Sequence, residues 1–257
     1  MTSLDHRLRG PEDAPVLVLS NSLGTTQELW ERQLPALAQR FRVLTYDHPG
    51  HGSSDLPARP CTVESLTRTL VTLLDELGFE RVSLCGISLG GMVGMALALE
   101  APERVERLVL ACTSAYLGPR EAWDERARVV RAKGTEAIAD AVVGRWFTPE
   151  LVHGEPETVA RFRAMLAATP PEGYARCCEA IATWDGRERI SAIAAPVLLI
   201  AGADDPATPA EHAELIATQI PGARLVVLER AAHLANVERA QAFTRATLEH
   251  LGQEVTV

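Results

Sequence analysis

The sequence predicts an α/β fold in which helices cover both faces of a mostly parallel sheet. Short apolar runs rich in Val, Leu and Ile recur along the chain, and helical segments separate them. Such runs are typical of strands buried on both faces, and strand–helix alternation favours parallel pairing. The 257 residues are enough for one large domain, or for a core domain with an insertion.

The predicted core strands share this β-rich composition and are Val16–Ser20, Arg42–Tyr46, Arg81–Cys85, Arg107–Ala111, Pro196–Ala201 and Arg224–Leu228. Near the N-terminus, the alternating segment "LDHRLRG" predicts a short antiparallel edge strand. The segment between the fourth and fifth core strands contains no convincing strand. It shows helical stretches at Glu121–Lys133, Thr135–Trp146, Pro156–Thr169 and Pro171–Trp184.

This helical block predicts a cap inserted into an α/β core. We expect a first core part over residues 1–115, a helical cap over 116–190 and a second core part over 191–257. Open α/β sheets bind ligands at the carboxyl edge of their strands. The cap is therefore expected to cover that edge.

Composition and charge narrow the classes of protein. The apolar fraction of 47% and the charged fraction of 23% are ordinary for a soluble globular chain. The net charge of −9 argues against nucleic acid or an anionic membrane as a partner. The N-terminal segment has no apolar signal core, and no stretch is long enough to span a bilayer. We expect a cytoplasmic protein, and its oligomeric state stays open.

The cysteines show no spacing typical of a zinc site or of a redox motif. Cys85 and Cys112 lie in apolar runs and are expected to be small core residues. Their odd number, five, favours a reducing compartment over a disulfide framework.

The segment "RVSLCGISLGGMVGMALALEAP" is typical of a strand, a sharp turn and a helix, with Ser88 at the turn. A serine there adopts a strained backbone, and Gly86 and Gly90 remove side chains that would clash with it. The following helix directs its N-terminus at the serine, which favours developing negative charge. The alternative is that these glycines only let a helix pack closely on the sheet. A base and a carboxylate further along the chain decide between the two.

A serine hydroxyl needs a base, and His233 is the candidate. It follows the last core strand and precedes a helix, which places it at the sheet edge that carries Ser88. The histidines in polar or helical surroundings are expected at the surface: His6, His153, His212 and His250. The turn "DHPGHGSS", which contains His48 and His51, is expected to be structural.

The base needs a carboxylate to orient it. The loop "AGADDPATP" after the fifth core strand offers Asp204 and Asp205. Asp205 is preferred because it lies three residues beyond the glycine that ends the strand, and Asp204 is then a solvated neighbour. The resulting order Ser88, Asp205, His233 is the order expected on this scaffold.

An oxyanion hole completes the predicted machinery. One donor is expected to be the backbone N–H of Leu89, the residue after the nucleophile. The second is expected from the loop "LSNSLGTTQELW" after the first core strand, and the N–H of Leu23 is the candidate.

With these motifs in place, the chain resembles the α/β-hydrolase superfamily over nearly its whole length. Within it, "SNSLGTTQELWERQLPAL", "RVLTYDHPGHGSS", "GISLGGMVGMALA", "RWFTPE" and "LIAGADDPATP" resemble 3-oxoadipate enol-lactonases of the β-ketoadipate pathway for aromatic catabolism. Two departures stand out. The N-terminus looks shorter than usual, so the first edge strand is expected to be missing or reduced. His48 and Pro49 stand where many relatives have an arginine-containing turn. Some relatives are fused to a decarboxylase domain, and no such domain is expected within these 257 residues.

The resemblance implies that Ser88 attacks the carbonyl of 3-oxoadipate enol-lactone and that His233 takes its proton. An acyl-enzyme then forms and is hydrolysed to 3-oxoadipate, with no metal or organic cofactor required. The substrate carries a second carboxylate, so the cap should supply a cation. Arg145 is the candidate for binding this carboxylate, and the neighbouring Trp146 is the candidate for binding the flat ring of the lactone. The other arginines of the insertion remain open for this role: Arg120, Arg126, Arg128, Arg131, Arg161, Arg163, Arg176, Arg187 and Arg189.

Other functions stay open on the same fold. A cap lined only by apolar groups would favour a carboxylesterase, or a cofactor-free perhydrolase or haloperoxidase-like enzyme, using the same triad. An acyltransferase would need a pocket that excludes water and admits an acceptor. A ligand-binding member that lost catalysis would normally lack a triad residue, and none is missing here. The fold alone licenses none of these choices.

Overall fold

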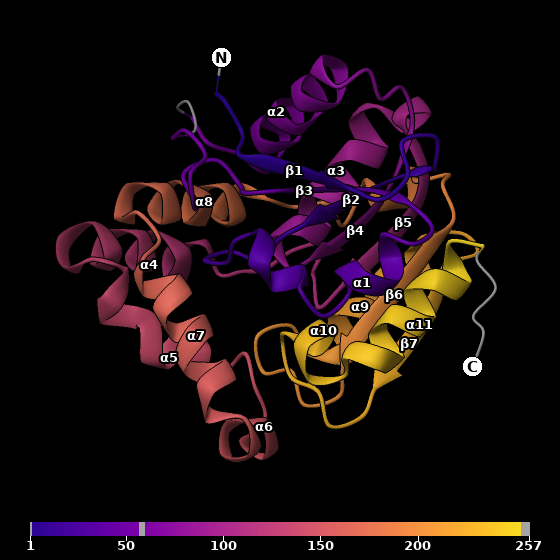
Figure 1. Ribbon diagram of the computed structural model, residues 1–257. Helices are drawn as coiled ribbons and strands as arrows, with labels where there is room; N and C mark the ends of the chain where they lie inside the picture. Colours follow the sequence, from indigo (N-terminus) through magenta and orange to yellow (C-terminus); the bar gives the residue numbers. More distant parts are fainter. Residues whose placement is uncertain (1, 57–59, 253–257) are drawn as a thin grey trace.

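The computed structural model describes residues 2–56 and 60–252, and its centre is a twisted sheet (Figure 1). In this part of the chain the sheet has seven strands in the order β1-β3-β2-β4-β5-β6-β7. The strands are β1 (His6–Arg9), β2 (Val16–Ser20), β3 (Arg42–Tyr46), β4 (Val82–Ile87), β5 (Val105–Ala111), β6 (Val197–Gly202) and β7 (Arg224–Leu228). Every neighbouring pair is parallel except β1 with β3. The predicted α/β fold class is confirmed.

The core strands form where the buried apolar runs predict them. The bounds of β2, β3 and β7 agree with the prediction, and β4 extends to Ile87. In the central ladders, Ser20 pairs with Gly86 and Ile87 pairs with Ala111, so the carboxyl ends of β2, β4 and β5 meet at one edge. The N-terminal edge strand is present as β1, although it has only four residues.

Helices cover both faces of the sheet, and Figure 1 shows α2 and α11 on opposite sides of it. The helices of the core are α1 (Leu34–Leu37), α2 (Val63–Glu76), α3 (Leu89–Glu100), α9 (Ala210–Gln219), α10 (Ala235–Glu238) and α11 (Ala240–His250). Helix α2 begins at a capping box, because the Thr62 hydroxyl accepts from Ser65 N–H at 3.1 Å and Ser65 Oγ accepts from Thr62 N–H at 2.9 Å. Its buried face packs against α3.

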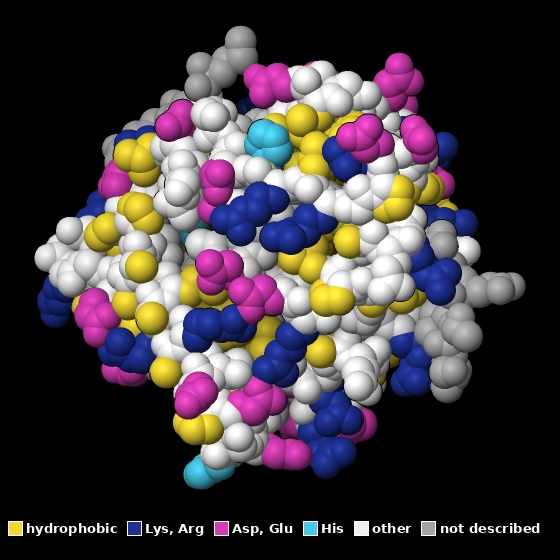
Figure 2. All heavy atoms as spheres, viewed as in Figure 1, with side chains coloured by type: hydrophobic (Ala, Val, Ile, Leu, Met, Phe, Trp, Pro, Cys, Tyr) yellow, Lys and Arg dark blue, Asp and Glu magenta, His cyan; other side chains and the backbone are white. Residues whose placement is uncertain are grey.

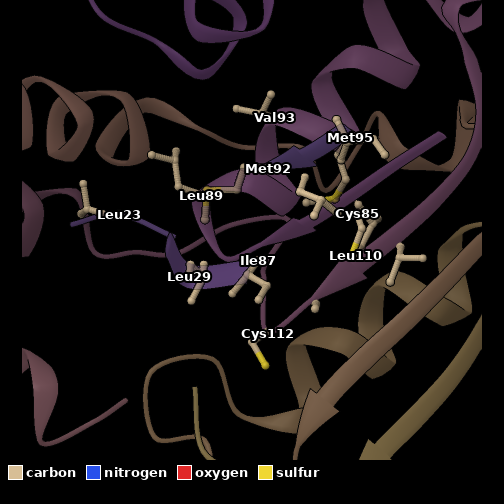
Figure 3. Close-up of a cluster of buried hydrophobic side chains, with 14 of the residues drawn as sticks. Leu23, Leu29, Cys85, Ile87, Leu89, Met92, Val93, Met95, Leu110 and Cys112 are labelled. Atoms are coloured by element: carbon tan, nitrogen blue, oxygen red, sulfur yellow. The ribbon is translucent and has the colours of Figure 1, made fainter. Parts of the chain in front are cut away.

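The junction of β4 and α3 lies inside the hydrophobic core. Figure 3 shows Leu89, Met92 and Met95 of α3 beside Cys85 and Ile87 of β4, and all five of these side chains are fully buried. Packing of this kind fixes the strand-to-helix turn, because interiors are as dense as organic crystals and leave little room for the backbone to shift. The cysteines are free and buried, as expected for Cys85 and Cys112.

The segment between β5 and β6 forms helices that lie together beside the sheet (Figure 1). These cap helices are α4 (Arg120–Lys133), α5 (Ala139–Val143), α6 (Pro149–Gly154), α7 (Pro156–Ala167) and α8 (Pro171–Thr183). Helices α4 and α8 pack against each other. No helix in residues 2–56 and 60–252 combines the length and the hydropathy that a membrane span needs.

The prediction of one continuous helix over Thr135–Trp146 is wrong. The segment starts as a 3₁₀ helix, Thr135–Ile138, and continues as the short helix α5, which ends at Val143. The Thr135 hydroxyl donates to the backbone O of Ala167 at 2.9 Å, so contacts with the end of α7 hold this first turn in place. Tertiary packing overrides helix propensity here.

Helix α6 was not predicted, although its start signals stand in the sequence. Thr148 is its N-cap and accepts a hydrogen bond from Leu151 N–H at 3.4 Å. Pro149 occupies the first helical position, where its missing N–H costs nothing. The helix is only six residues long, too short to show a clear apolar period.

Candidate active site

A cavity of about 190 Å³ lies between the carboxyl edge of the sheet and the cap. The core contributes Ser22, Leu23, Ser88, Ala207 and His233 to its wall. The cap contributes Leu117, Gly118, Ala122, Trp123, Arg126, Val142, Arg145, Trp146, Tyr174 and Ile181. The cavity therefore brings together Ser88, His233, Leu23, Arg145 and Trp146, which the sequence singled out separately.

Ser88 sits on a strained turn between β4 and α3. Its backbone has φ 56° and ψ −114°, a conformation that non-glycine residues rarely adopt. A Cβ on Gly86 would lie 2.2 Å from the O of Gly90, and a Cβ on Gly90 would lie 2.1 Å from the O of Ser20. Only glycine fits at either position. The Thr113 hydroxyl donates to Ser88 O at 2.7 Å and holds the turn from the other side.

His233 and Asp205 are joined by a hydrogen bond. His233 Nδ1 lies 2.9 Å from Asp205 Oδ2, and both side chains are buried. Because an ionised carboxylate only accepts, Nδ1 carries the proton, and Nε2 of the neutral ring is a proton acceptor. This tautomer is the one that a general base toward Ser88 needs.

The surroundings of Asp205 keep its carboxylate charged. Asp205 Oδ1 accepts from the N–H of Ala207 at 2.8 Å and of Thr208 at 3.0 Å, and Oδ2 accepts from Thr208 Oγ1 at 2.6 Å. Burial raises the pKa of Asp205, but the charge of His233 and the hydrogen bonds from His233 and Thr208 outweigh it and leave the pKa below its usual value. Asp204 is exposed to solvent.

Ser88 and His233 line the same cavity, and in the described residues Ser88 Oγ makes no hydrogen bond to another side chain. The hydroxyl is thus free to turn toward His233 or toward a ligand. Hydrogen bonds between a nucleophile and its base are often loose without substrate and tighten in the complex. The loop that carries His233 is tied to the cap, because Leu234 N–H donates to Trp146 O at 3.0 Å.

The backbone N–H groups of Leu23 and Leu89 make no hydrogen bond within the described residues. Both residues are buried, and Leu23 lines the cavity. Buried N–H groups without a partner are rare in folded proteins. Unpaired donors at the residue after Ser88 and in the wall of the same cavity are of the kind that binds a developing oxyanion.

The cap supplies two cations to the cavity. Arg145 is half-buried, and burial together with the positive charge of Arg126 lowers its pKa. Arg126, on α4, was one of several open candidates in the sequence. Its guanidinium lies 4.4 Å from the ring centroid of Trp123. Trp146 is buried and packs edge-on against Phe162.

Arg126 and Arg145 differ from the other arginines of the cap. Within residues 2–56 and 60–252, neither has a carboxylate oxygen within 4.0 Å. Each of the other cap arginines is paired with at least one Asp or Glu: Arg120, Arg128, Arg131, Arg161, Arg163, Arg176, Arg187 and Arg189. Figure 2 shows basic and acidic side chains interspersed over one face of the molecule, as such surface pairs require. Among the cap arginines in the described residues, the two without a carboxylate partner are therefore the two that line the cavity.

Some residues of the site were not predicted from the sequence. Thr208 holds Asp205, and its signal is the Asp-x-x-Thr spacing in "DPAT", which is typical of a side chain that caps its own loop. Tyr174 lines the cavity on α8, and nothing in the local sequence of that helix marks it.

The histidines outside the cavity also differ in part from expectation. His250 is buried at the end of α11, so the expectation that it lies at the surface is wrong. Its ring is covered because the last turn of α11 packs against the sheet beside Arg107, which donates to His250 O. His48 and His51 are fully buried and contact the loop that carries Leu23, rather than the cavity.

Because His48 and His51 are buried, we expect the folded protein to lose stability as the pH falls. Burial lowers the pKa of His48 to about 4, and burial with the charge of His48 lowers the pKa of His51 to about 3. In the unfolded chain both rings titrate near their ordinary value, so below that pH the unfolded chain binds protons that the folded chain excludes. We expect each histidine to remove about 2 kcal/mol from the free energy of unfolding between about pH 7 and about pH 5.

Urea denaturation across this pH range measures the loss. The His51→Gln variant should show a shallower dependence of its unfolding free energy on pH than the wild type, because its amide does not titrate. Equal slopes for the two proteins would contradict the assignment of the effect to His51.

Comparisons with known proteins agree with the fold described above. The family model of the alpha/beta hydrolase fold matches residues 15–240. 3-Oxoadipate enol-lactonase 2 of Acinetobacter baylyi is 40% identical over 95% of this chain and 91% of its own length. The enol-lactonase from Burkholderia xenovorans LB400 superposes with a TM-score of 0.95 at 42% identity, over 98% of this chain and 97% of that chain. A hydrolase from Pseudomonas aeruginosa PA01 superposes with a TM-score of 0.94 at 50% identity, over 98% and 95%.

Proposed function

Because the chain belongs to the α/β-hydrolase family, we propose that it is a serine hydrolase that opens 3-oxoadipate enol-lactone to 3-oxoadipate. The reaction would serve the degradation of aromatic compounds through the β-ketoadipate pathway. One observation carries the proposal. The cavity that holds Ser88 and His233 also holds Arg126 and Arg145, two cations without a carboxylate partner in the described chain. The similarity to enol-lactonases supports the same substrate.

In the proposed reaction, Ser88 Oγ attacks the lactone carbonyl while His233 Nε2 takes its proton. Asp205 stabilises the imidazolium that results, and the N–H groups of Leu23 and Leu89 bind the oxyanion. Collapse of the tetrahedral intermediate breaks the ring C–O bond and leaves an acyl-enzyme that still carries the enol. His233 returns the proton to the enol oxygen or to its carbon.

Release of the product needs a second attack. A water that gives its proton to His233 adds to the acyl carbonyl, and Ser88 leaves with the proton restored. Ketonisation of the freed enol removes the internal nucleophile that could close the ring again. This step helps to drive the reaction forward, and each proton in the scheme is moved by His233 or solvent.

The carboxylate of the lactone requires a local cation, since the net charge of −9 repels anions over longer distances. An anion placed between or beside these two half-buried guanidiniums stabilises them, because it offsets the repulsion between their positive charges. Arginine suits this role because its planar donor fork matches a carboxylate. Trp146 and Trp123 supply flat apolar surface for the ring of the lactone.

We expect Arg145→Met and Arg126→Met each to raise KM for the lactone by about 10- to 100-fold, the value of one lost charge-assisted hydrogen bond. Methionine keeps apolar bulk but removes the charge. The same lactone with its free carboxylate converted to a methyl ester lacks the negative charge, so its KM should be the same in both variants as in the wild type. Steady-state kinetics on both compounds measures the difference.

Arg128→Met is the matched control, because Arg128 lies on the same helix as Arg126 but is exposed and paired with Glu125. Its KM for the lactone should equal that of the wild type. The proposal of an anion site fails if both cavity arginines can be replaced without a change in this KM.

The function itself is tested by the product. Wild-type protein mixed with enol-lactone generated in situ should form 3-oxoadipate faster than spontaneous hydrolysis does. NMR measures the rate at which the product forms. A wild-type protein that leaves the lactone unchanged but hydrolyses a neutral aryl ester would replace the proposed lactonase with a carboxylesterase on the same residues.

A further inference from the structure

We propose that His51 is a positioning residue for the oxyanion hole. The backbone N–H of Gly24 donates to His51 Nε2 at 3.0 Å, and the histidine ring is fully buried. Gly24 directly follows Leu23, whose N–H is the proposed second oxyanion donor. The inference rests on the proposed hydrolase mechanism, and it assigns a part of it to the turn "DHPGHGSS".

The contact fixes the protonation of the ring. An amide N–H can only donate, so Nε2 of His51 must present its lone pair. The proton of the neutral ring then lies on Nδ1, which faces Pro49 O at 3.4 Å. His48 has the opposite tautomer, because its Nε2 lies 2.9 Å from Asn21 O and must donate to it. Two neighbouring histidines thus hold the same loop, because His51 accepts a hydrogen bond from it and His48 donates one to it.

Their contacts fall on the first and third peptide groups of the segment from Asn21 to Gly24, called the oxyanion loop below. The O of Asn21 accepts from His48, and from Gly90 N–H at 3.0 Å, which fixes the first peptide plane. The O of Ser22 accepts from Thr25 N–H at 3.2 Å and from Thr25 Oγ1 at 2.8 Å, which fixes the second.

The second plane also contains the N–H of Leu23, and in a trans peptide this N–H points away from the O of Ser22. His51 fixes the third plane through Gly24 N–H. Hydrogen bonds therefore hold the peptide planes on both sides of Leu23, and they fix the direction in which its N–H points. Without the acceptor at His51, the third plane can rotate about the flexible glycine, whose φ is +80°.

The ring of His51 has little freedom to move. It packs on the ring of Tyr174 in the cap, with centroids 6.5 Å apart and planes inclined by 32°. A Cβ on Gly173, the residue before Tyr174, would lie 2.0 Å from Gly50 O, so the turn and α8 are in close contact. The acceptor atom is held from the cap side as well as from its own turn.

The test compares His51→Phe with His51→Gln. Phenylalanine keeps the ring that packs on Tyr174 but offers no acceptor, whereas the glutamine amide oxygen reaches the place of Nε2. We expect His51→Phe to lower kcat for the lactone by about 10- to 100-fold with KM unchanged, because a misplaced oxyanion donor weakens only the transition state. His51→Gln should restore most of the lost kcat.

A fluorophosphonate probe gives a readout that does not depend on the lactone. It forms a bond from Ser88 Oγ to phosphorus, expels fluoride and places a phosphoryl oxygen in the oxyanion hole. The rate constant of inactivation should fall in His51→Phe by the same factor as kcat and should recover in His51→Gln. Mass spectrometry of the labelled peptide checks that Ser88 is the site.

His250→Phe is the control for burial alone, because His250 is also a buried histidine but lies at the end of α11. Whatever its thermal stability, this variant should react with the probe at the wild-type rate. Wild-type reaction rates in His51→Phe, or a loss that His51→Gln does not repair, would overturn the positioning role. If the wild type is labelled at Ser88 but ignores the lactone, the proposed substrate fails while the probe rates still decide the role of His51. A wild type that is not labelled at all would overturn both.

Discussion

The Ser88→Ala variant is expected to lose on the order of 10⁴- to 10⁶-fold in kcat for lactone hydrolysis. The alanine removes the only atom that forms the covalent bond in the proposed mechanism, and the residual rate comes from the oxyanion hole and from substrate binding. The turn itself should survive, because Gly86 and Gly90 make room for the backbone and not for the hydroxyl. Binding of the lactone should therefore persist, and isothermal titration with the variant measures it.

Ser83→Ala is the matched control, since Ser83 is a buried serine on β4, the strand that ends at the Ser88 turn. It should keep the kcat of the wild type. A Ser88→Ala variant that still hydrolyses the lactone at a rate near that of Ser83→Ala would show that another group is the nucleophile.

The Asp205→Asn variant is expected to lose on the order of 10⁴-fold in kcat with its fold intact. The asparagine oxygen can still accept from the N–H groups of Ala207 and Thr208, so the loop should keep its shape. Its amide, however, can donate to His233 Nδ1, which favours the tautomer that carries the proton on Nε2. That ring cannot accept the proton of Ser88.

The neighbouring Asp204→Asn substitution makes the same chemical change on an exposed side chain and should leave kcat unaltered. Parallel assays of the two variants, with thermal unfolding to compare their folds, distinguish the roles of the two aspartates. Equal losses in both variants, or a larger loss in Asp204→Asn, would contradict the assignment of the carboxylate to Asp205.

Much of the fold could be predicted because its signals are local. The runs at Val16–Ser20 and Arg224–Leu228 are apolar, β-rich and bounded by turns, and the strands have these bounds. The break of the predicted helix Thr135–Trp146 could not be predicted from the sequence, because it depends on the hydrogen bond of Thr135 to the end of α7. Contacts between segments far apart in sequence override local preference in this region.

The residues of the site also differ in whether the local sequence marks them. Ser88 stands out locally because its flanking glycines satisfy a steric demand that a strand–turn–helix imposes. The local sequence does not indicate which cap arginines bind an anion, because this depends on which guanidiniums contact a carboxylate. In the tertiary structure eight of them are paired with Asp or Glu, and Arg126 and Arg145 line the cavity without such a partner. The place of His51 beneath the oxyanion loop is hidden for the same reason: it depends on Gly24, far from it in sequence.

The most direct test of the proposed function is the ratio of kcat/KM for 3-oxoadipate enol-lactone to kcat/KM for a neutral short-chain aryl ester, both measured with the wild-type protein. We expect a ratio far above one, because two unpaired arginines favour an anionic lactone over a neutral ester. A ratio below one would contradict it, and would mean that the cavity is built for neutral esters in spite of Arg126 and Arg145.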